Sequence, residues 1–418
     1  MIAPSFCYIF CSLCTFFRKM ALPILFISKT VFSGCAMRCE GVLGKTTLLD
    51  DMNPCSAKNN IKNEVQYLSR KIFIVLFSFF FVSTLFLGIL ITYSSMSIVK
   101  VSKPHLNDIQ IDVQSNVKYH EFYIQDIFPK NDFYAIKSPV ALIDENYNYD
   151  SEGYIVYEHP NGEKYYSPYL LTQQTIKYLG SYNLTQDRLY LEKAKEYTDK
   201  LFELAEKKDN KMHFPHHYIF ELHGLPSEKL DPDWYSIYAQ GQALSVFSRM
   251  YQTTGDKKYL AWANQTFNGL DLDHDPRKNT TLSYLDSEGH LWFGYYPKKQ
   301  NHKSTSALIR AVVGFYDYYQ INQTKSASFM LNASITTFYE QIELYRVEGD
   351  ISIEDLKHKN QDIGRHRLNI LALKYLYRIT NEVYFNDMAN AFYSDYNFKK
   401  EKNSMYHLER YIRKEWLE

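Results

Sequence analysis

One stretch of the chain joins an aromatic, polar loop directly to the first turn of a predicted helix. It reads Asp233-Trp234-Tyr235-Ser236-Ile237-Tyr238-Ala239-Gln240-Gly241-Gln242-Ala243-Leu244-Ser245. Aromatic rings stack on the apolar faces of sugars while a tyrosine hydroxyl forms hydrogen bonds. We therefore predict that Tyr235, Gln240 and Gln242 contact a carbohydrate. The alternative for the two glutamines is a structural role, such as capping free amides in the first helical turn.

Histidines and aspartates gather beside this stretch, at His216, His217, His223, Asp231 and Asp233. Side chains of these types can bind metal ions, but their spacing matches no zinc pattern. A hydrogen-bonded loop is the simpler interpretation, and we predict no metal site.

The elements that position these residues are predicted to be helical hairpins. From residue 167 to the end, apolar residues recur at helical spacing. Between two such helices, Gly255 suits a helix C-cap and Asp256 an N-cap. Comparable helix openings recur at 190–194, 259–263 and 384–389. Repeated hairpins predict a mainly α fold, with a C-terminal α/α toroid (an incomplete α/α barrel) over residues 167–418.

Long, aromatic loops separate the predicted hairpins at 213–234, 275–305 and 347–365. Functional residues gather on such loops when a rigid scaffold presents them. We expect these three loops to share one functional face. Residues 118–166 instead read as a small β-rich region, in which Asn161-Gly162 is a favoured tight-turn pair.

The N-terminal part predicts a membrane anchor. Residues 72–92 form an uncharged apolar run, long enough to cross a bilayer as one helix. Basic residues precede the run, so residues 1–71 are expected to be a disordered cytosolic segment and everything after residue 92 to be luminal. This is a single-pass type II arrangement typical of the Golgi membrane, with residues 93–117 as a stem. The basic residues are Lys58, Lys62, Arg70 and Lys71.

Cysteine and sequon placement agrees with this topology. All six cysteines precede the predicted anchor, so no disulfide framework is expected after it. All five Asn-x-Ser/Thr sequons follow it, which predicts a glycoprotein: Asn183, Asn264, Asn279, Asn322 and Asn332. The 418 residues carry 47 basic and 47 acidic side chains, and a formal net charge of zero argues against nucleic-acid binding.

Four blocks of the sequence resemble the D-glucuronyl C5-epimerase family. The stretch from Trp234 is similar to the family's Trp-Tyr-Ser-x-x-Ala-Gln-Gly-Gln-Ala, and the resemblance covers roughly residues 167–396. The other similar blocks are Tyr165-Tyr166-Ser167-Pro168, Leu291-Trp292-Phe293-Gly294-Tyr295-Tyr296-Pro297 with Gly314-Phe315-Tyr316-Asp317, and Glu354-Asp355-Leu356-Lys357-His358 with Arg365-His366-Arg367-Leu368-Asn369. The resemblance implies conversion of D-glucuronate to L-iduronate in heparosan-type polysaccharide, no organic cofactor, and a possible homodimer.

Inversion at carbon 5 needs a base on one face of the sugar, a proton donor on the other and positive groups at the carboxylate. Of the family's three proton-transfer tyrosines, only one corresponds to a tyrosine here, Tyr296. The second corresponds to Glu354 and the third to Arg365. The resemblance therefore implies Tyr296, Glu354 and His366 as catalytic residues. The implied substrate-binding residues are Tyr235, Gln240, Gln242, Tyr295, Lys357, His358 and Arg365.

Two alternatives stay open at the sequence level. Substitutions at family positions are compatible with an inactive protein that only binds glycans. The second alternative is a glycoside hydrolase or a polysaccharide lyase on the same toroid, because a fold does not determine a reaction.

Overall fold

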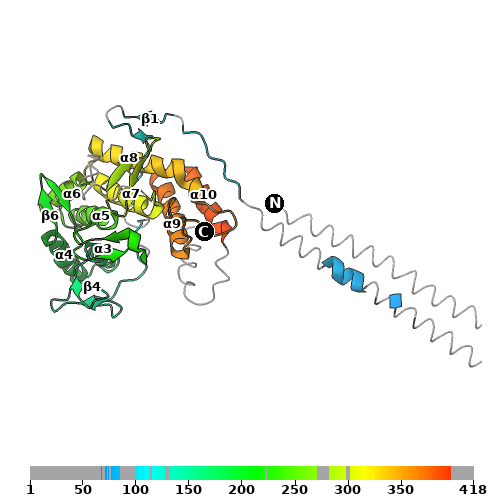
Figure 1. Ribbon diagram of the computed structural model, residues 1–418, viewed down its shortest axis with the longest axis horizontal. Coiled ribbons are helices and arrows are strands. Elements are labelled where there is room, and N and C mark those ends of the chain that lie inside the picture. Colours follow the sequence, from blue (N-terminus) through cyan, green and yellow to red (C-terminus); the bar gives the residue numbers. More distant parts are fainter. Residues whose placement is uncertain are drawn as a thin grey trace, which may run out of the picture. The chain divides into compact units, whose positions relative to one another are not determined.

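The chain divides into two compact units, residues 1–92 and 93–418, which are considered separately (Figure 1). The computed structural model describes residues 67, 71–72, 74, 77–84, 99–106, 108–112, 115–127, 132–221, 224–270, 282–297 and 302–396.

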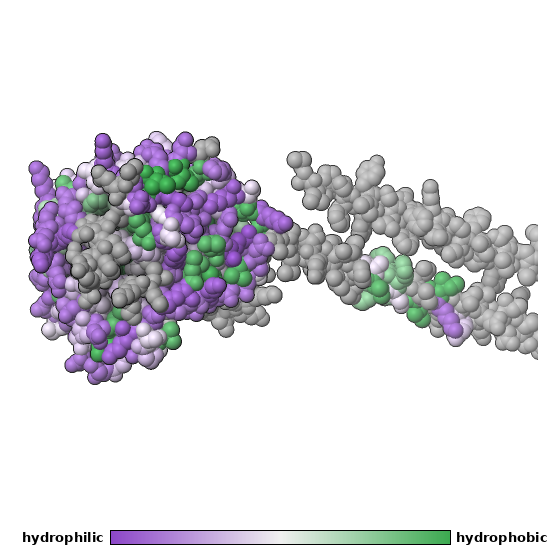
Figure 2. Space-filling view, turned by 45° about the horizontal axis from the view of Figure 1, so that its top comes forward, coloured by the Kyte–Doolittle hydropathy of each residue, from purple (hydrophilic) through white to green (hydrophobic). Residues whose placement is uncertain are grey.

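In the first unit, the described residues are helical and most are apolar. Phe77, Phe79, Phe80, Phe81 and Val82 all expose more than half of their surface. Hydrophobic side chains of this segment are seen in green in Figure 2. The predicted anchor is described at 72, 74 and 77–84 only, whereas the predicted cytosolic segment and its cysteines lie outside the described residues. Within the described ranges, no helix combines the length and apolar character needed to cross a membrane.

The second unit is built from helical hairpins. Within each hairpin the two helices pack on each other, and α3, α5, α7 and α9 also pack in succession as an inner row (Figure 1). This arrangement confirms the mainly α fold and the hairpin order of an incomplete α/α toroid. The hairpins are α3 (Pro168–Thr185) with α4 (Arg188–Glu203), α5 (Ile237–Thr254) with α6 (Lys257–Asn268), α7 (Thr305–Tyr319) with α8 (Lys325–Gln341), and α9 (Ile363–Thr380) with α10 (Val383–Asp395).

Short side chains cap the helices where the chain turns. Asp256 accepts a hydrogen bond from the backbone of Lys258 to begin α6, and Gly255 ends α5 with a φ of 70°. Both caps were predicted. Asp187 and Thr324 cap α4 and α8 in the same way. Because these groups satisfy otherwise unpaired amides, each hairpin turn is specified locally.

The strands are short and all pair antiparallel. Strand β4 lies between β3 and β5, and Gly162 turns the chain between β4 and β5 with a φ of 86°. Within the predicted β-rich region, residues 148–165 form a small sheet before α3, whereas β2 pairs with β1. The strands are β1 (Gln110–Ile111), β2 (Lys118–Tyr119), β3 (Asn148–Tyr149), β4 (Ile155–Glu158), β5 (Lys164–Tyr165), β6 (Glu206–Lys208), β7 (Lys211–His213), β8 (Phe220–Glu221), β9 (Lys229–Leu230), β10 (Ser283–Leu285) and β11 (Leu291–Phe293), with 3-10 helices η2 (Pro226–Glu228) and η3 (Ile342–Tyr345).

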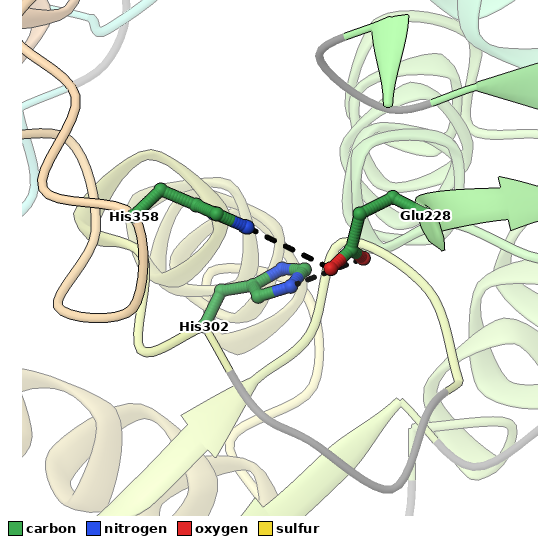
Figure 3. A group of neighbouring side chains, drawn as sticks. All are labelled: Glu228, His302 and His358. Carbon is green, nitrogen blue, oxygen red and sulfur yellow. Dashed lines mark ion pairs between the residues drawn. The ribbon is translucent and has the colours of Figure 1, made fainter. Parts of the chain in front are cut away.

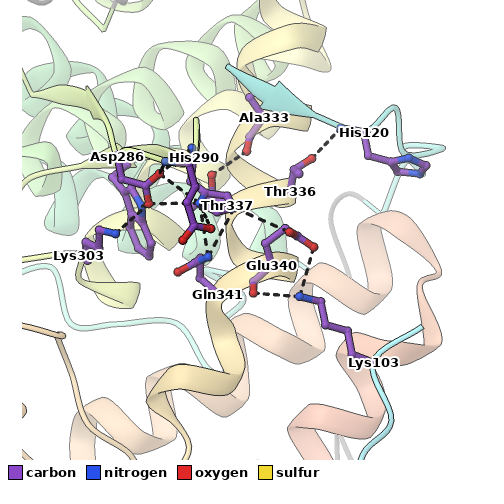
Figure 4. Close-up of polar contacts among 12 residues, drawn as sticks. Lys103, His120, Asp286, His290, Lys303, Ala333, Thr336, Thr337, Glu340 and Gln341 are labelled. Atoms are coloured by element: carbon purple, nitrogen blue, oxygen red, sulfur yellow. Dashed lines mark hydrogen bonds and ion pairs between the residues drawn. The ribbon is translucent and has the colours of Figure 1, made fainter. Parts of the chain in front are cut away.

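Part of the predicted stem and the first residues of the predicted β-rich region pack on the helices. Lys103 bonds the backbone oxygen of Glu340 at 3.0 Å and its carboxylate at 3.2 Å, and the His120 amide donates to Thr336 (Figure 4). The Phe122 amide donates to Asn332, whose side chain is buried. A glycan on Asn332 would conflict with this packing. Among the described sequons, Asn183 is exposed, whereas Asn264 and Asn322 bond each other.

Tyrosine hydroxyls connect the helices to the N-terminal chain. A buried tyrosine is stable when its hydroxyl finds a hydrogen-bond partner, and here the partners are backbone oxygens. The bonds run from Tyr178 to Leu142, Tyr190 to Val140, Tyr197 to Gly153, Tyr316 to Gln125 and Tyr339 to Pro104, at 2.7–3.0 Å. These five of the 37 tyrosines therefore have a structural role.

The glycine of the Trp234 stretch lies where two inner helices cross closely. A Cβ on Gly241 would lie 2.6 Å from the carbonyl oxygen of Arg310, and one on Gly314 would lie 2.6 Å from the oxygen of Gly241. Backbone atoms cannot yield as a flexible side chain can, so only glycine permits this approach of α5 and α7.

We expect Gly241→Ala to lower the free energy of unfolding by about 1–3 kcal/mol, the usual cost of overpacking a core. Urea denaturation measures the change. Gly180→Ala is the matched control, because it is also helical but its added methyl meets only the side chain of Ile136. Equal stability of the two variants would contradict this account of the crossing.

Candidate active site

The N-terminal turns of the inner helices meet at one place. The Tyr238 hydroxyl on α5 donates to Ser306 on α7 at 2.8 Å, and Arg365 on α9 donates to the Tyr238 hydroxyl at 3.1 Å. The ring of Tyr169 on α3 packs edge-on against Tyr238, with ring centres 5.5 Å apart. The loops that precede these helices therefore converge. This confirms that the three predicted loops contribute to one region.

The first cluster surrounds Glu354, in the loop before α9. Its Oε1 accepts hydrogen bonds from the Tyr295 hydroxyl and, at 3.3 Å, from Ser306. Arg365 Nε lies 3.0 Å from the same oxygen. Ser304 donates to the Tyr295 hydroxyl at 2.8 Å. Three predicted residues, Tyr295, Glu354 and Arg365, are thus brought together in one polar group, in which Tyr295 and Glu354 are buried and Arg365 is partly exposed.

The second cluster surrounds Glu228, at the end of η2 (Figure 3). The Tyr296 hydroxyl donates to one carboxylate oxygen and the Lys357 ammonium to the other. His302 Nε2 lies 3.5 Å from Oε2 and His358 Nε2 lies 3.6 Å from Oε1. Tyr296, Lys357 and His358 were predicted. Glu228 and His302 were not, because no motif marks either residue in its loop.

The clusters adjoin through neighbouring residues. Tyr295 and Tyr296 follow each other along the chain but bond different carboxylates. The His302 ring contacts both tyrosines, with ring centres 6.0 Å and 5.7 Å away. Two phenol–carboxylate pairs therefore lie side by side at the helix N-termini.

The charge states of these pairs follow from their surroundings. Burial raises the pKa of Tyr295, and nearby Tyr238 and Glu354 raise it further. Burial and the bond to Glu228 likewise raise the pKa of Tyr296. Although burial opposes ionisation of Glu228, its bonds from Lys357 and Tyr296 hold its pKa at about 2. In this arrangement both tyrosines are protonated at neutral pH.

A further cation, Arg310 of α7, was not predicted. Its guanidinium carbon lies 5.7 Å from the ring centre of Tyr238, 5.7 Å from that of Tyr134 and 5.4 Å from that of Phe133. Its Nε is buried without a hydrogen-bond partner. Among the residues that the structure describes, no carboxylate lies within ion-pair distance of Arg310. Arg310 and Arg365 thus both lie against Tyr238.

Comparison with known proteins bears on these clusters. Residues 208–394 match the sequence pattern of the family described as D-glucuronyl C5-epimerase C-terminus, and this range contains both clusters. This segment is similar to the C-terminal domain of that family. The resemblance found in the sequence is therefore confirmed. The D-glucuronyl C5-epimerase of Caenorhabditis elegans is 24% identical over 143 residues, which cover 31% of this chain and 22% of that protein.

Solved structures of two sugar epimerases are also similar. Cellobiose 2-epimerase from Bacillus thermoamylovorans B4167 is 12% identical, covers 59% of this chain and 66% of its own, and has a TM-score of 0.43. The corresponding enzyme from Spirochaeta thermophila DSM 6192 is 11% identical, with coverages of 59% and 63% and a TM-score of 0.43. Similarity at this level bears on neither substrate nor reaction.

Three residues predicted to bind substrate have protein partners. Tyr235 donates to Glu206 at 2.6 Å. Gln240 donates to the backbone oxygens of Met212 and Thr266, and Gln242 accepts from Thr172. Both glutamines are buried, so these bonds join α5 to its neighbours. The structural alternative fits Gln240 and Gln242 better than sugar binding.

The histidines near the Trp234 stretch form the expected bonded loop. His217 Nδ1 lies 2.5 Å from Asp233, and His216 stacks on Trp234 with ring centres 3.9 Å apart. His223 lies outside the described residues.

His366, predicted to be catalytic, is directed toward α10. It is fully buried and its ring stacks on Phe392. Its Nδ1 accepts from the backbone amide of Ser352 at 2.9 Å. These contacts make His366 a positioning residue for the loop that carries Glu354. Burial lowers the pKa of His366 to about 4, so the native protein holds it neutral.

This burial predicts acid-sensitive stability. Between pH 6.5 and 4 the unfolded chain protonates His366 but the native chain does not, so stability falls as pH falls. At pH 5 the loss from this residue is about 2 kcal/mol relative to pH 7.5. Urea denaturation at both values should show a weaker pH dependence for His366→Asn, while the exposed-residue control His217→Asn keeps that of the parent. Equal pH dependence of all three would contradict the assignment.

Proposed function

We propose that this protein is a carbohydrate epimerase that converts D-glucuronate to L-iduronate within heparosan- or heparan-type polysaccharide. The observation that carries the proposal is the adjacent pair of phenol–carboxylate clusters at the helix N-termini, inside a domain of the C5-epimerase family.

Proton transfer is divided between the two clusters. Glu354 is the base that takes the hydrogen from carbon 5, next to the sugar carboxylate. Tyr296, protonated and bonded to Glu228, delivers a proton from the opposite face. The Lys357 ammonium beside Glu228 offsets the negative charge that remains on the phenol and carboxylate. Exchange with solvent then removes the proton from Glu354 and restores that of Tyr296.

The substrate carboxylate is held by two arginines. Guanidinium groups bind carboxylates through paired hydrogen bonds. Arg310 and Arg365 both lie against Tyr238, and Arg310 has no described carboxylate partner of its own. Lys357, predicted for this role, is engaged with Glu228. Positive charge at this position stabilises the enediolate that forms when carbon 5 loses its proton.

The proposal includes a cellular setting. A Golgi membrane protein anchored by residues 72–92, with its catalytic unit in the lumen, would meet nascent polysaccharide, and homodimer formation is part of the same expectation. The support is the apolar run and its basic flank. The reaction as written uses side chains alone and needs no organic cofactor.

The test is incubation of the purified protein with heparosan in deuterium oxide. We expect deuterium at carbon 5 and new iduronate, both detected by NMR. Absence of exchange would favour an inactive glycan-binding protein. An unsaturated, ultraviolet-absorbing product would indicate a lyase, and new reducing ends a hydrolase.

A further inference from the structure

The Glu228 cluster has the composition of a metal site as well as that of a proton-donor site. Glu228, His302 and His358 come from three separate loops, before α5, α7 and α9 respectively. One ligand atom of each lies within 4.8 Å of the others (Figure 3). Two histidines and one glutamate are an established donor set for zinc.

The separations are close to those a metal would require. His302 Nε2 and His358 Nε2 lie 3.5 Å and 3.6 Å from oxygens of Glu228. Ligand atoms bonded to tetrahedral zinc at about 2.0–2.1 Å are roughly 3.3 Å apart. The two nitrogens face different oxygens of Glu228, and the three ligand atoms lie within 4.8 Å of one another, so their separations must shorten by up to about 1.5 Å for them to share one ion.

The surroundings of His358 also support a metal site. Nδ1 of His358 lies 3.3 Å from Oδ1 of Asp355, a fully buried carboxylate. The backbone amides of Lys357 and His358 donate to that oxygen at 2.9 Å and 2.7 Å and hold it in place. The 3.3 Å from Nδ1 to Oδ1 is an ion-pair distance, and a carboxylate on the Nδ1 side of a histidine leaves Nε2 to face the other candidate ligands, as in many zinc sites.

The Glu228 cluster already holds a positively charged group. The Lys357 ammonium bonds Glu228 and lies 3.2 Å from His302 Nε2. It thus occupies the region between two of the candidate ligands. The Lys357 side chain is 28% exposed, so the ammonium can move into solvent without being buried elsewhere.

We propose that Glu228, His302 and His358 bind one divalent transition-metal ion of the zinc type, in exchange for the Lys357 ammonium. The ion would join three loops that are far apart along the chain, so it should also raise the melting temperature. This site goes beyond the proposed epimerase activity, and its occupation requires no polysaccharide.

The experiment uses the full chain after treatment with a chelator. Zinc chloride is titrated by calorimetry and cobalt chloride by visible absorption, with no sugar present. We expect one ion per chain for the parent protein. Lys357→Met should tighten zinc binding by at least about tenfold, because it removes a competing positive charge. His302→Gln and His358→Gln should each abolish the high-affinity step.

A gain of zinc affinity in Lys357→Met cannot come from misfolding. The test therefore does not depend only on the two histidine variants that are expected to lose binding. His217→Gln is the matched control, and its binding should equal that of the parent. Undiminished zinc binding in both His302→Gln and His358→Gln would overturn the proposal. Weaker zinc binding in Lys357→Met than in the parent would also overturn it, as would a lack of zinc binding in the parent and all variants. Because binding is measured without substrate, failure of the epimerase proposal would be recognised separately.

Discussion

Replacing Glu354 with glutamine should lower the rate of deuterium exchange at carbon 5 of glucuronate by about a thousandfold, within the usual range for loss of a general base. Glutamine has nearly the same shape and can still accept from Tyr295, but it cannot take the proton. The rate is measured by NMR on heparosan in deuterium oxide. Glu196→Gln, a change to an exposed carboxylate of α4, is the matched control and should keep the parent rate.

Tyr296→Phe separates the two faces of the reaction. Without the phenolic proton, Glu354 can still remove the hydrogen from carbon 5 and return solvent deuterium to the same face. We therefore expect continued exchange in glucuronate with little iduronate formed. Loss of exchange in Tyr296→Phe together with full exchange in Glu354→Gln would assign the base to the tyrosine instead and contradict the proposed roles.

Arg249→Met should lower the free energy of unfolding by about 3–5 kcal/mol, as expected when one partner of a buried ion pair is removed. Arg249 of α5 bonds Asp317 of α7 through Nε at 2.7 Å. Its Nη2 bonds Asp132, from the chain before α3, at 2.7 Å. All three side chains are almost completely buried. Burial raises the pKa of Asp317, and Arg249 is the charge that opposes this effect.

Urea denaturation at neutral pH measures the loss. Lys193→Met removes an exposed ion pair with Glu196 and should cost less than about 1 kcal/mol. Adding Asp132→Asn and Asp317→Asn to Arg249→Met should recover part of the stability, because no buried charge then lacks a partner. If Arg249→Met lowers the free energy of unfolding no more than Lys193→Met does, the ion pairs of Arg249 with Asp132 and Asp317 contribute little to stability.

The network also explains why the N-terminal chain belongs to the helical unit. Asp132 precedes the first hairpin, yet its ion pair lies among residues of α5 and α7. Tyrosine hydroxyls reach the same N-terminal region from four helices. A sequence-based division between a stem, a β-rich region and a toroid misses these contacts, because they connect residues far apart along the chain.

Local sequence determined the scaffold. Helical spacing of apolar residues and caps such as Gly255 and Asp256 specify the hairpins, since each cap satisfies backbone groups within a few residues of itself. The three long loops could be assigned to one face because the order of hairpins repeats. Family resemblance located Tyr295, Tyr296, Glu354 and Lys357, all of which take part in the two clusters.

Tertiary structure alone decided the roles within the site. Nothing local distinguishes Glu228, His302 or Arg310 from other loop or helix residues. They can be recognised as site residues only because the folded chain brings the N-terminal turns of α5, α7 and α9 together. Gln240, Gln242 and His366 looked functional in sequence, but all three are buried and form hydrogen bonds with other parts of the protein. Side-chain spacing along one helix does not determine which neighbour lies opposite, whereas hydrogen-bond partners and pKa values depend on that neighbour.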